Sequence, residues 1–126
     1  MNIWTNGCYD ILHVGHIALF KYAKSLGGNL IVGIDSDDRV NKLKGNGRPI
    51  NNQNDRKEML ESIKFIDEVI IFNTKEEMCD LLTKKNINTI VIGDDYKDKP
   101  VTGSDIIKDI VFFKKIGNYS TTNYLK

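Results

Sequence analysis

The histidines and one glycine of a single short segment have the types and spacing that phosphate chemistry requires. His13 and His16 are the only histidines in the chain, and Gly15 lies between them, after a strand-like segment at residues 1–5 and at the start of a helical pattern at residues 16–26. A glycine lets a ligand approach the backbone, and a helix start presents unpaired N–H groups and a positive dipole end. Imidazoles add hydrogen-bond donors that can be cationic near neutral pH. A helix-capping histidine beside a surface histidine is the structural alternative, but both histidines together after a glycine turn favour a phosphate site.

Cations follow in a polar segment, residues 35–54. Lys42, Lys44 and Arg48 lie within seven residues around glycines, and Lys44 is predicted to close over phosphates as a lid, the alternative being a solvated lysine. Arg56 falls at a predicted helix start, where a cation opposes the helix dipole, so capping does not explain it. We expect Arg56 to contact a substrate phosphate, with simple surface exposure as the alternative.

Alternating apolar runs and amphipathic stretches predict the elements that must position these residues. Strands are expected at residues 1–5, 29–34, 68–72, 89–92 and 110–113, and helices at 16–26, from 54 or 55 to 63, at 75–85 and from 120 onward. Residues 35–54 are expected to form a long loop with one helical turn near 37–43. This alternation predicts an α/β fold: one Rossmann-like, doubly wound, parallel five-stranded sheet with helices on both faces. Ligands of such sheets bind beyond the carboxyl ends of the strands, where strand order reverses.

Composition excludes several classes of protein. Eighteen Lys and Arg against seventeen Asp and Glu give a net charge of +1, so no basic field indicates nucleic-acid binding. No apolar run approaches the roughly 18–20 residues that span a bilayer. Cys8 and Cys79 are too few and too far apart for a disulfide framework. We therefore expect one cytoplasmic domain, residues 1–126, whose length leaves room for no second domain.

The segment from Asn6 to His16 resembles the GxFDxLHxGH form of the HxGH signature, which marks the nucleotidylyltransferase superfamily that includes cytidylyltransferases. Later segments support the resemblance in the same order. Residues 44–50 with Arg56 are similar to KGxxRPxxxxxxR of the ADP-heptose-forming adenylyltransferase domain, and residues 65–70 are similar to YVDEVI of glycerol-3-phosphate cytidylyltransferases. Two further segments resemble motifs found in both groups. Residues 93–97 are similar to GDDW or GGDYK, and residues 120–122 match STT.

The resemblance implies transfer of a nucleoside monophosphate from ATP or CTP to a sugar phosphate or polyol phosphate, with release of pyrophosphate. Positioning and preorganised positive charge supply most of such catalysis. Mg²⁺ is expected to arrive with the nucleotide, without direct protein ligands. Relatives are commonly dimers, so a homodimer is expected as well. The base and the acceptor stay open at this point.

The resemblance also implies roles for particular residues. His13, His16 and Lys44 are expected to be catalytic. Nucleotide binding is expected at Gly7, Cys8, Tyr9, Asp10, Gly15, Gly93, Asp94, Lys115, Ser120, Thr121 and Thr122, and substrate binding at Asp35, Arg48 and Arg56.

Several of these roles have alternatives. Asp10 could orient a helix N-terminus or a hydrated Mg²⁺, and the sequence does not choose. Asp94 could belong to an ordinary acidic turn, and the hydroxyls at 120–122 could simply cap a helix. Lys115 stands where glycerol-type enzymes have arginine, and lysine lacks the bidentate fork.

Two other functions are weighed against a sugar-phosphate enzyme. One is a cytidylyltransferase specifically of the glycerol-3-phosphate type. The other is a nucleotide-binding module without turnover, which the pair His13 and His16 argues against because binding alone does not need both. A dinucleotide dehydrogenase is disfavoured because no G-x-G-x-x-G follows the first strand.

Overall fold

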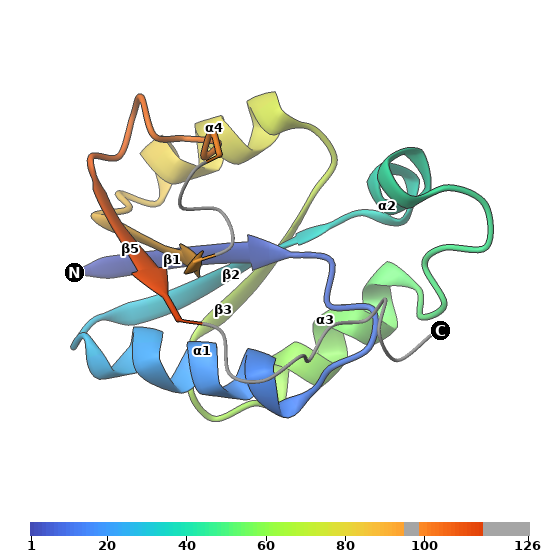
Figure 1. Cartoon of the computed structure of the whole chain (residues 1–126), viewed down its shortest axis with the longest axis horizontal. Coiled ribbons are helices and arrows are strands. Elements are labelled where there is room, and N and C mark those ends of the chain that lie inside the picture. Colours follow the sequence, from blue (N-terminus) through green and yellow to red (C-terminus); the bar gives the residue numbers. More distant parts are fainter. Residues whose placement is uncertain (95–98, 115–126) are drawn as a thin grey trace.

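A five-stranded parallel sheet forms the centre of the molecule in the computed structural model, which describes residues 1–94 and 99–114 (Figure 1). Its order is β3-β2-β1-β4-β5. The strands are β1 (Asn2–Gly7), β2 (Asn29–Asp35), β3 (Glu68–Phe72), β4 (Thr89–Gly93) and β5 (Asp109–Phe113). The helices are α1 (Val14–Ser25), α2 (Asp37–Lys44), α3 (Gln53–Glu61) and α4 (Lys75–Lys84). The predicted fold class is confirmed.

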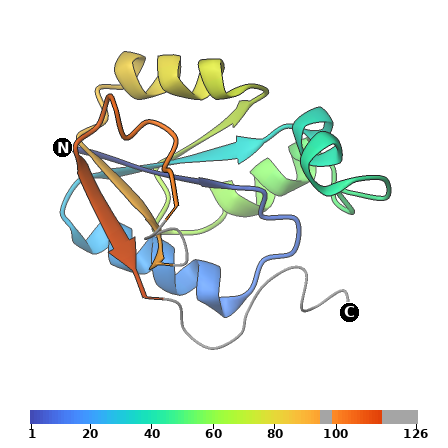
Figure 2. The ribbon, with the colours of Figure 1, turned by 45° about the horizontal axis from the view of Figure 1, so that its top comes forward.

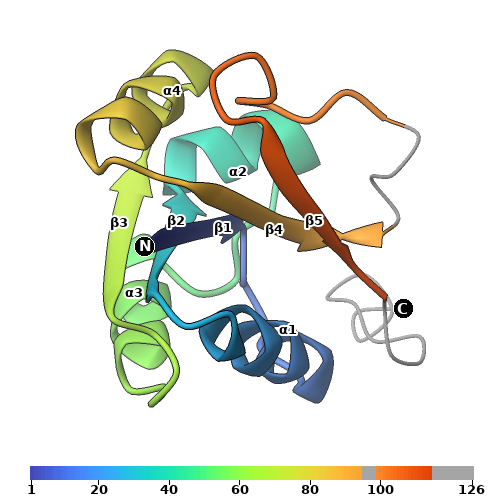
Figure 3. The ribbon, with the colours of Figure 1, turned by 90° about the vertical axis from the view of Figure 1, so that its left-hand side faces the viewer.

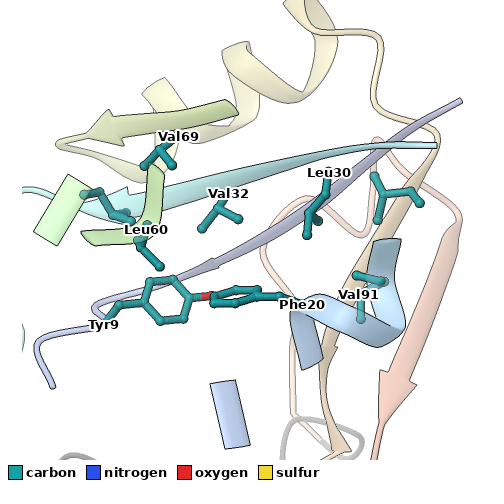
Figure 4. Packing of buried hydrophobic residues seen from close by; sticks show 10 residues of the cluster. Tyr9, Phe20, Leu30, Val32, Leu60, Val69 and Val91 are labelled. Carbon is teal, nitrogen blue, oxygen red and sulfur yellow. The ribbon is translucent and has the colours of Figure 1, made fainter. Parts of the chain in front are cut away.

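Helices cover both faces of the sheet because its central strands are apolar on both sides. Helices α1 and α3 lie against one face and α4 against the other (Figure 3). Leu30 and Val32 point into the core on the α1 and α3 side, with Phe20 and Leu60 (Figure 4). Ile31, between them in β2, packs in the opposite core with residues of α4. This alternation of neighbouring side chains is the period-2 geometry of a strand.

Gly33 in β2 makes room for the largest side chain of the core on the α4 face. A Cβ at Gly33 would lie 2.3 Å from the ring of Trp4, which is fully buried in β1. The Trp4 indole also donates a hydrogen bond to the Asn6 side chain (3.0 Å). Trp4 is therefore a core residue and not a platform for stacking a base.

Residues 37–44 form a complete helix, α2, so the expected long loop with one helical turn is wrong for this segment. The Ser36 hydroxyl caps α2 by accepting the N–H of Arg39 (3.2 Å). Aspartates in the first turn and lysines in the last complement the helix dipole. Only Val40 is buried, so α2 lacks the apolar stripe by which an amphipathic helix is recognised in a sequence.

The other predicted boundaries in the described part agree with the observed ones to within two residues. Helix α3 is capped by Asn52, whose side chain accepts the N–H of Asp55 (2.9 Å), and not by Asn54 or Asp55 as expected. The predicted helix at residues 120–126 lies outside the described residues. Within residues 1–94 and 99–114, no helix has the length and apolar character needed to cross a membrane.

Strand order reverses beside β1. The chain runs from β1 outward to β2 and β3, and then returns through α4 to β4 on the other side of β1. The segments that follow β1 and β2 leave the same edge of the sheet, toward α1 and α2 (Figure 2). In doubly wound sheets ligands bind at such a reversal, beyond the carboxyl ends of the strands. Here that position is the turn between β1 and α1.

Candidate active site

Tyr9 shapes the turn between β1 and α1. Its backbone has a φ of +53°, in the left-handed region. Its ring is buried and contacts the rings of His16 (centroids 5.1 Å apart) and Phe20 (5.4 Å). A Cβ at Gly7 would approach the Tyr9 ring to 3.0 Å, so glycine suits that position. Tyr9 thus uses its side chain to pack the turn onto α1.

The two histidines lie together at the start of α1. Their rings are stacked, with centroids 3.7 Å apart and an angle of 19° between the planes. The backbone N–H of His13 donates to Nδ1 of His16 (3.3 Å). Because Nδ1 accepts this bond, neutral His16 carries its proton on Nε2 and can donate from there. The first turn of α1 contains no acidic residue, so nothing in that turn neutralises the positive end of the helix.

Asp10 is fully buried, and its carboxylate is bonded to protein groups. Its carboxylate accepts the backbone N–H groups of Ile50 (2.8 Å) and Asn51 (2.8 Å) and Nε of Arg48 (3.2 Å). Burial raises the pKa of Asp10, but these hydrogen bonds and the Arg48 charge outweigh it, and the pKa lies below its ordinary value. Neither expected role of Asp10 describes this arrangement, because the carboxylate joins two loops of the site.

Arg56 is also fully buried, which contradicts the alternative of simple surface exposure, while its contact with a substrate phosphate stays a prediction. It donates to the carbonyl oxygens of Cys8 (2.9 Å), Asp35 (2.7 Å) and Asn51 (3.0 Å) and to the carboxylate of Asp37 (2.8 Å). These partners follow β1, end β2, precede α3 and begin α2. The guanidinium therefore ties together the segments at the carboxyl edge of the sheet, and its donors are used by protein oxygens.

Lys44 and Arg48 differ in how firmly they are held. Lys44 ends α2 and is exposed, and it is followed by Gly45 (φ +92°) and Gly47 (φ +84°), where an added Cβ would meet no atom within 4 Å. Arg48 is mostly buried and held by Asp10. Its Nη2 is buried, and no acceptor within the described residues bonds to it. A buried donor of this kind costs free energy unless a ligand accepts from it.

Asp35 and Cys8 lie at the same edge but engage the protein. The Asp35 carboxylate pairs with Nε of Arg39 (2.9 Å), one helical turn along the chain. Burial raises the pKa of the Cys8 thiol, against the opposing effects of Arg56 and Lys44. The thiol therefore stays protonated near neutral pH. The hydrogen bond that Cys8 makes to Arg56 is through its backbone carbonyl oxygen.

The remaining expected residues lie at the end of β4 or beyond the described part. Gly93 ends β4, directly beside β1 in the sheet, and Asp94 follows it, half-buried. Both are at the carboxyl edge where the strand order reverses. Four of the expected residues lie outside the described part of the chain: Lys115, Ser120, Thr121 and Thr122.

The sequence as a whole matches the cytidylyltransferase-like family over residues 4–122. The chain belongs to the cytidylyltransferase-like family. Membership makes it a nucleotidyltransferase domain, as the HxGH segment predicts. Among curated proteins it is 44% identical over 124 residues to bifunctional protein HldE of Campylobacter concisus and 44% identical over 124 residues to that of Aliarcobacter butzleri. The match covers 98% of this chain but 26% of either relative, so the chain spans about a quarter of their length.

Solved structures agree with the cytidylyltransferase-like fold. A lipopolysaccharide core biosynthesis protein from Thermoplasma volcanium superposes with a TM-score of 0.70 at 25% identity, covering 95% of this chain and 98% of that one. A protein of unknown function from Archaeoglobus fulgidus gives a TM-score of 0.72 at 17% identity, covering 95% and 94% of the two chains. The second match concerns the fold alone.

The carboxylates of this cytidylyltransferase-like site do not form a set of metal ligands. Asp10 accepts three protein donors and Asp35 pairs with Arg39. Across residues 1–94 and 99–114 no group of three or more His, Cys, Asp or Glu side chains could hold a metal ion. That Mg²⁺ arrives with the nucleotide stays a prediction.

Asn51 is the site residue that sequence reasoning missed. It bonds to Asp10 through both its backbone and its side chain, and its carbonyl oxygen accepts from Arg56. Asn52 and Asn54 are its near neighbours in the sequence, and no local pattern distinguishes Asn51 from them. The motif similarity around Arg48 and Arg56 was the one signal in this segment, and it indicated the charged residues.

Proposed function

We propose that this chain transfers a nucleoside monophosphate from ATP or CTP to the phosphate of a phosphorylated sugar or polyol and releases pyrophosphate. The observation that carries the proposal is the stacked pair His13 and His16 at the N-terminus of α1, whose first turn contains no acidic residue, where strand order reverses. Such a position binds anions through backbone N–H groups and the helix dipole. The imidazoles add hydrogen-bond donors at the same helix start.

The reaction needs two anions brought into line and charge stabilised on the bridging and leaving oxygens. In the proposed scheme the turn at Gly7–Asp10 and the start of α1 hold the triphosphate, with Mg²⁺ carried by the triphosphate itself. The proton on Nε2 lets His16 donate to a phosphate oxygen whose charge grows in the transition state. Because the acceptor phosphate attacks as an anion, the scheme needs no protein nucleophile.

Arg48 is the cation best placed to meet the acceptor phosphate in this scheme. Its Nε is fixed by Asp10, three residues before His13, and its buried Nη2 bonds to no acceptor in the described part. A phosphate oxygen would satisfy that donor. Lys44, exposed beside a glycine turn, is proposed to close over the phosphates.

A sugar phosphate is favoured as acceptor over a polyol phosphate. The similarity of residues 44–56 to the ADP-heptose-forming domain supports a sugar, and the similar structure from Thermoplasma volcanium is that of a lipopolysaccharide core biosynthesis protein. Gly93 and Asp94 are proposed to contact the base or ribose. The base itself, adenine or cytosine, is left to experiment.

The test is a screen of the four common nucleoside triphosphates against a panel of sugar and polyol phosphates, read by pyrophosphate release. Turnover with ATP or CTP and a sugar phosphate is expected. Turnover only with CTP and glycerol 3-phosphate would assign the glycerol type. Nucleotide binding without pyrophosphate release for any acceptor would indicate a non-catalytic module and overturn the proposal.

Two further properties stay predictions. A homodimer is expected, and light scattering of the purified chain would measure its mass. A cytoplasmic location is expected, and fractionation of the source cells would test it.

A further inference from the structure

Asn51 bonds to Asp10 in two ways. Its backbone N–H donates to the Asp10 carboxylate (2.8 Å), and its side-chain Nδ2 donates to the backbone carbonyl oxygen of Asp10. On its other side the Asn51 carbonyl oxygen accepts Nε of Arg56 (3.0 Å). Asp10 and Arg56 are both fully buried, and both bond to Asn51 in the loop between α2 and α3.

The side-chain bond has an effect that the bonds to the carboxylate lack. Ile50, Asn51 and Arg48 all donate to the Asp10 carboxylate, which turns about two side-chain torsions and could carry the loop with it. The Asn51 amide instead reaches the Asp10 main chain. It therefore fixes the loop relative to the backbone that leads into His13.

Arg48 depends on this fixation. Its guanidinium is oriented through Nε by Asp10, and Nη2 is buried without an acceptor among the described residues, on the loop that Asn51 holds. On the other side of Arg48 the chain passes through Gly45 and Gly47, where an added Cβ would meet no atom within 4 Å. Asn41 of α2 donates long hydrogen bonds to the carbonyl oxygens of Gly45 (3.4 Å) and Arg48 (3.5 Å), and these tie the loop to α2. The Asn51 side chain instead ties the loop to the main chain of the turn after β1.

We propose that Asn51 is a positioning residue that sets the Arg48 guanidinium relative to the phosphate-binding turn through its side-chain bond to the Asp10 carbonyl oxygen. The role given to Arg48 rests on the proposed function. Asn51 itself touches no reacting group.

The kinetic test compares Asn51→Ala with the matched control Asn54→Ala, on the exposed surface of α3. We expect Asn51→Ala to raise the KM for the acceptor phosphate about tenfold, the effect of 1.4 kcal/mol, with a much smaller change in kcat and in the KM for the nucleotide. The control should match the wild type. A uniform loss of kcat with a lowered melting temperature would show a merely structural role and overturn the proposal.

A double-mutant cycle separates positioning from an independent contact. If Asn51 acts through Arg48, Arg48→Ala combined with Asn51→Ala should be no worse than Arg48→Ala alone. Multiplicative losses would overturn the proposal.

Hydrogen exchange gives a readout that does not need turnover. Asn51→Ala should speed exchange of the backbone amides at positions 50 and 51, which donate to Asp10, while the amides of β1 and β2 keep their protection. Unchanged exchange at positions 50 and 51 would overturn the proposal. If no acceptor supports turnover while exchange rises as expected, the proposed function fails and the fixation of the loop by Asn51 stands.

Discussion

Under the proposed function, single residues at this site divide into those expected to face the substrate phosphates and those that hold other residues in place. His16 belongs to the first group, since its Nδ1 accepts from the His13 backbone and its proton is on Nε2. Asp10 and Arg56 belong to the second, because both are fully buried among protein partners. A charged residue in a nucleotide-binding motif can therefore contribute entirely through the loops that it joins.

His16→Ala is expected to lower kcat by about 100- to 1,000-fold, the loss typical when one preorganised donor of roughly 2.7–4 kcal/mol is removed. The fold should stay nearly intact because His16 is only partly buried. Pyrophosphate release under saturating substrates measures the rate, and circular dichroism with a thermal scan provides the control. A kcat near the wild-type value would remove His16 from the catalytic role.

At the scale of elements, α2 connects a firmly held end to an exposed end. Its start is fixed by the Ser36 cap and by the bond from Arg56 to Asp37. Its last residue, Lys44, is exposed beside a glycine turn. The N-terminal end of α2 is therefore held against the sheet, whereas Lys44 at its C-terminal end is less restrained. Closure of Lys44 over a ligand, as proposed, requires this difference.

Lys44→Ala should lower kcat more than it weakens nucleotide binding, because a closing cation acts mainly in the transition state. Lys85→Ala is the matched control, since Lys85 pairs with Glu68 at the amino ends of the strands, away from the site. Kinetics together with calorimetric titration of the nucleotide separate the two effects. A weakened Kd with an unchanged rate would contradict the lid.

The packing between β1 and β2 depends on the absence of a side chain at Gly33, which leaves room for the Trp4 indole. Gly33→Ala would place a Cβ 2.3 Å from Trp4, so strands or indole must shift, and overpacking of this kind typically costs about 1–3 kcal/mol. We expect a lower melting temperature and a lower urea midpoint. Unchanged stability would mean that the two strands are packed less tightly than the structure indicates.

At the scale of the whole molecule, the net charge of +1 conceals an uneven distribution. The histidine pair, Lys44 and Arg48 lie on segments at the carboxyl edge, beside carboxylates that pair within the protein. The single sheet brings together segments that are distant in the sequence, and the same edge collects every predicted site residue that the structure describes.

Stability of the whole domain should fall as pH decreases through the acid range. Burial raises the pKa of Asp67, but Lys24 and the Leu30 N–H outweigh it, and the pKa of Asp67, like that of Asp10, lies below its ordinary value. The unfolded chain then binds more protons, so the stabilisation is complete above the ordinary value of about 3.9 and is lost as pH falls through the folded pKa.

Urea unfolding at pH values from 7 to 3 measures this dependence. Asp67→Asn should be less stable than the wild type at pH 7 and lose less stability on acidification, because one of the two linked carboxylates is gone. Stability that rises as pH falls would contradict the assignment. Sodium chloride at fixed pH is the control for general screening.

The sequence by itself determined the parallel sheet and its strands and identified the turn before α1 as the candidate phosphate site, because apolar runs and the spacing of His13, Gly15 and His16 are local features. It did not reveal α2, which buries only Val40. Only the tertiary structure decided that Asp10 and Arg56 face inward and that Asn51 joins them. Their partners lie as far as 48 positions away along the chain, and burial of a charge is favourable only where the fold brings such partners together.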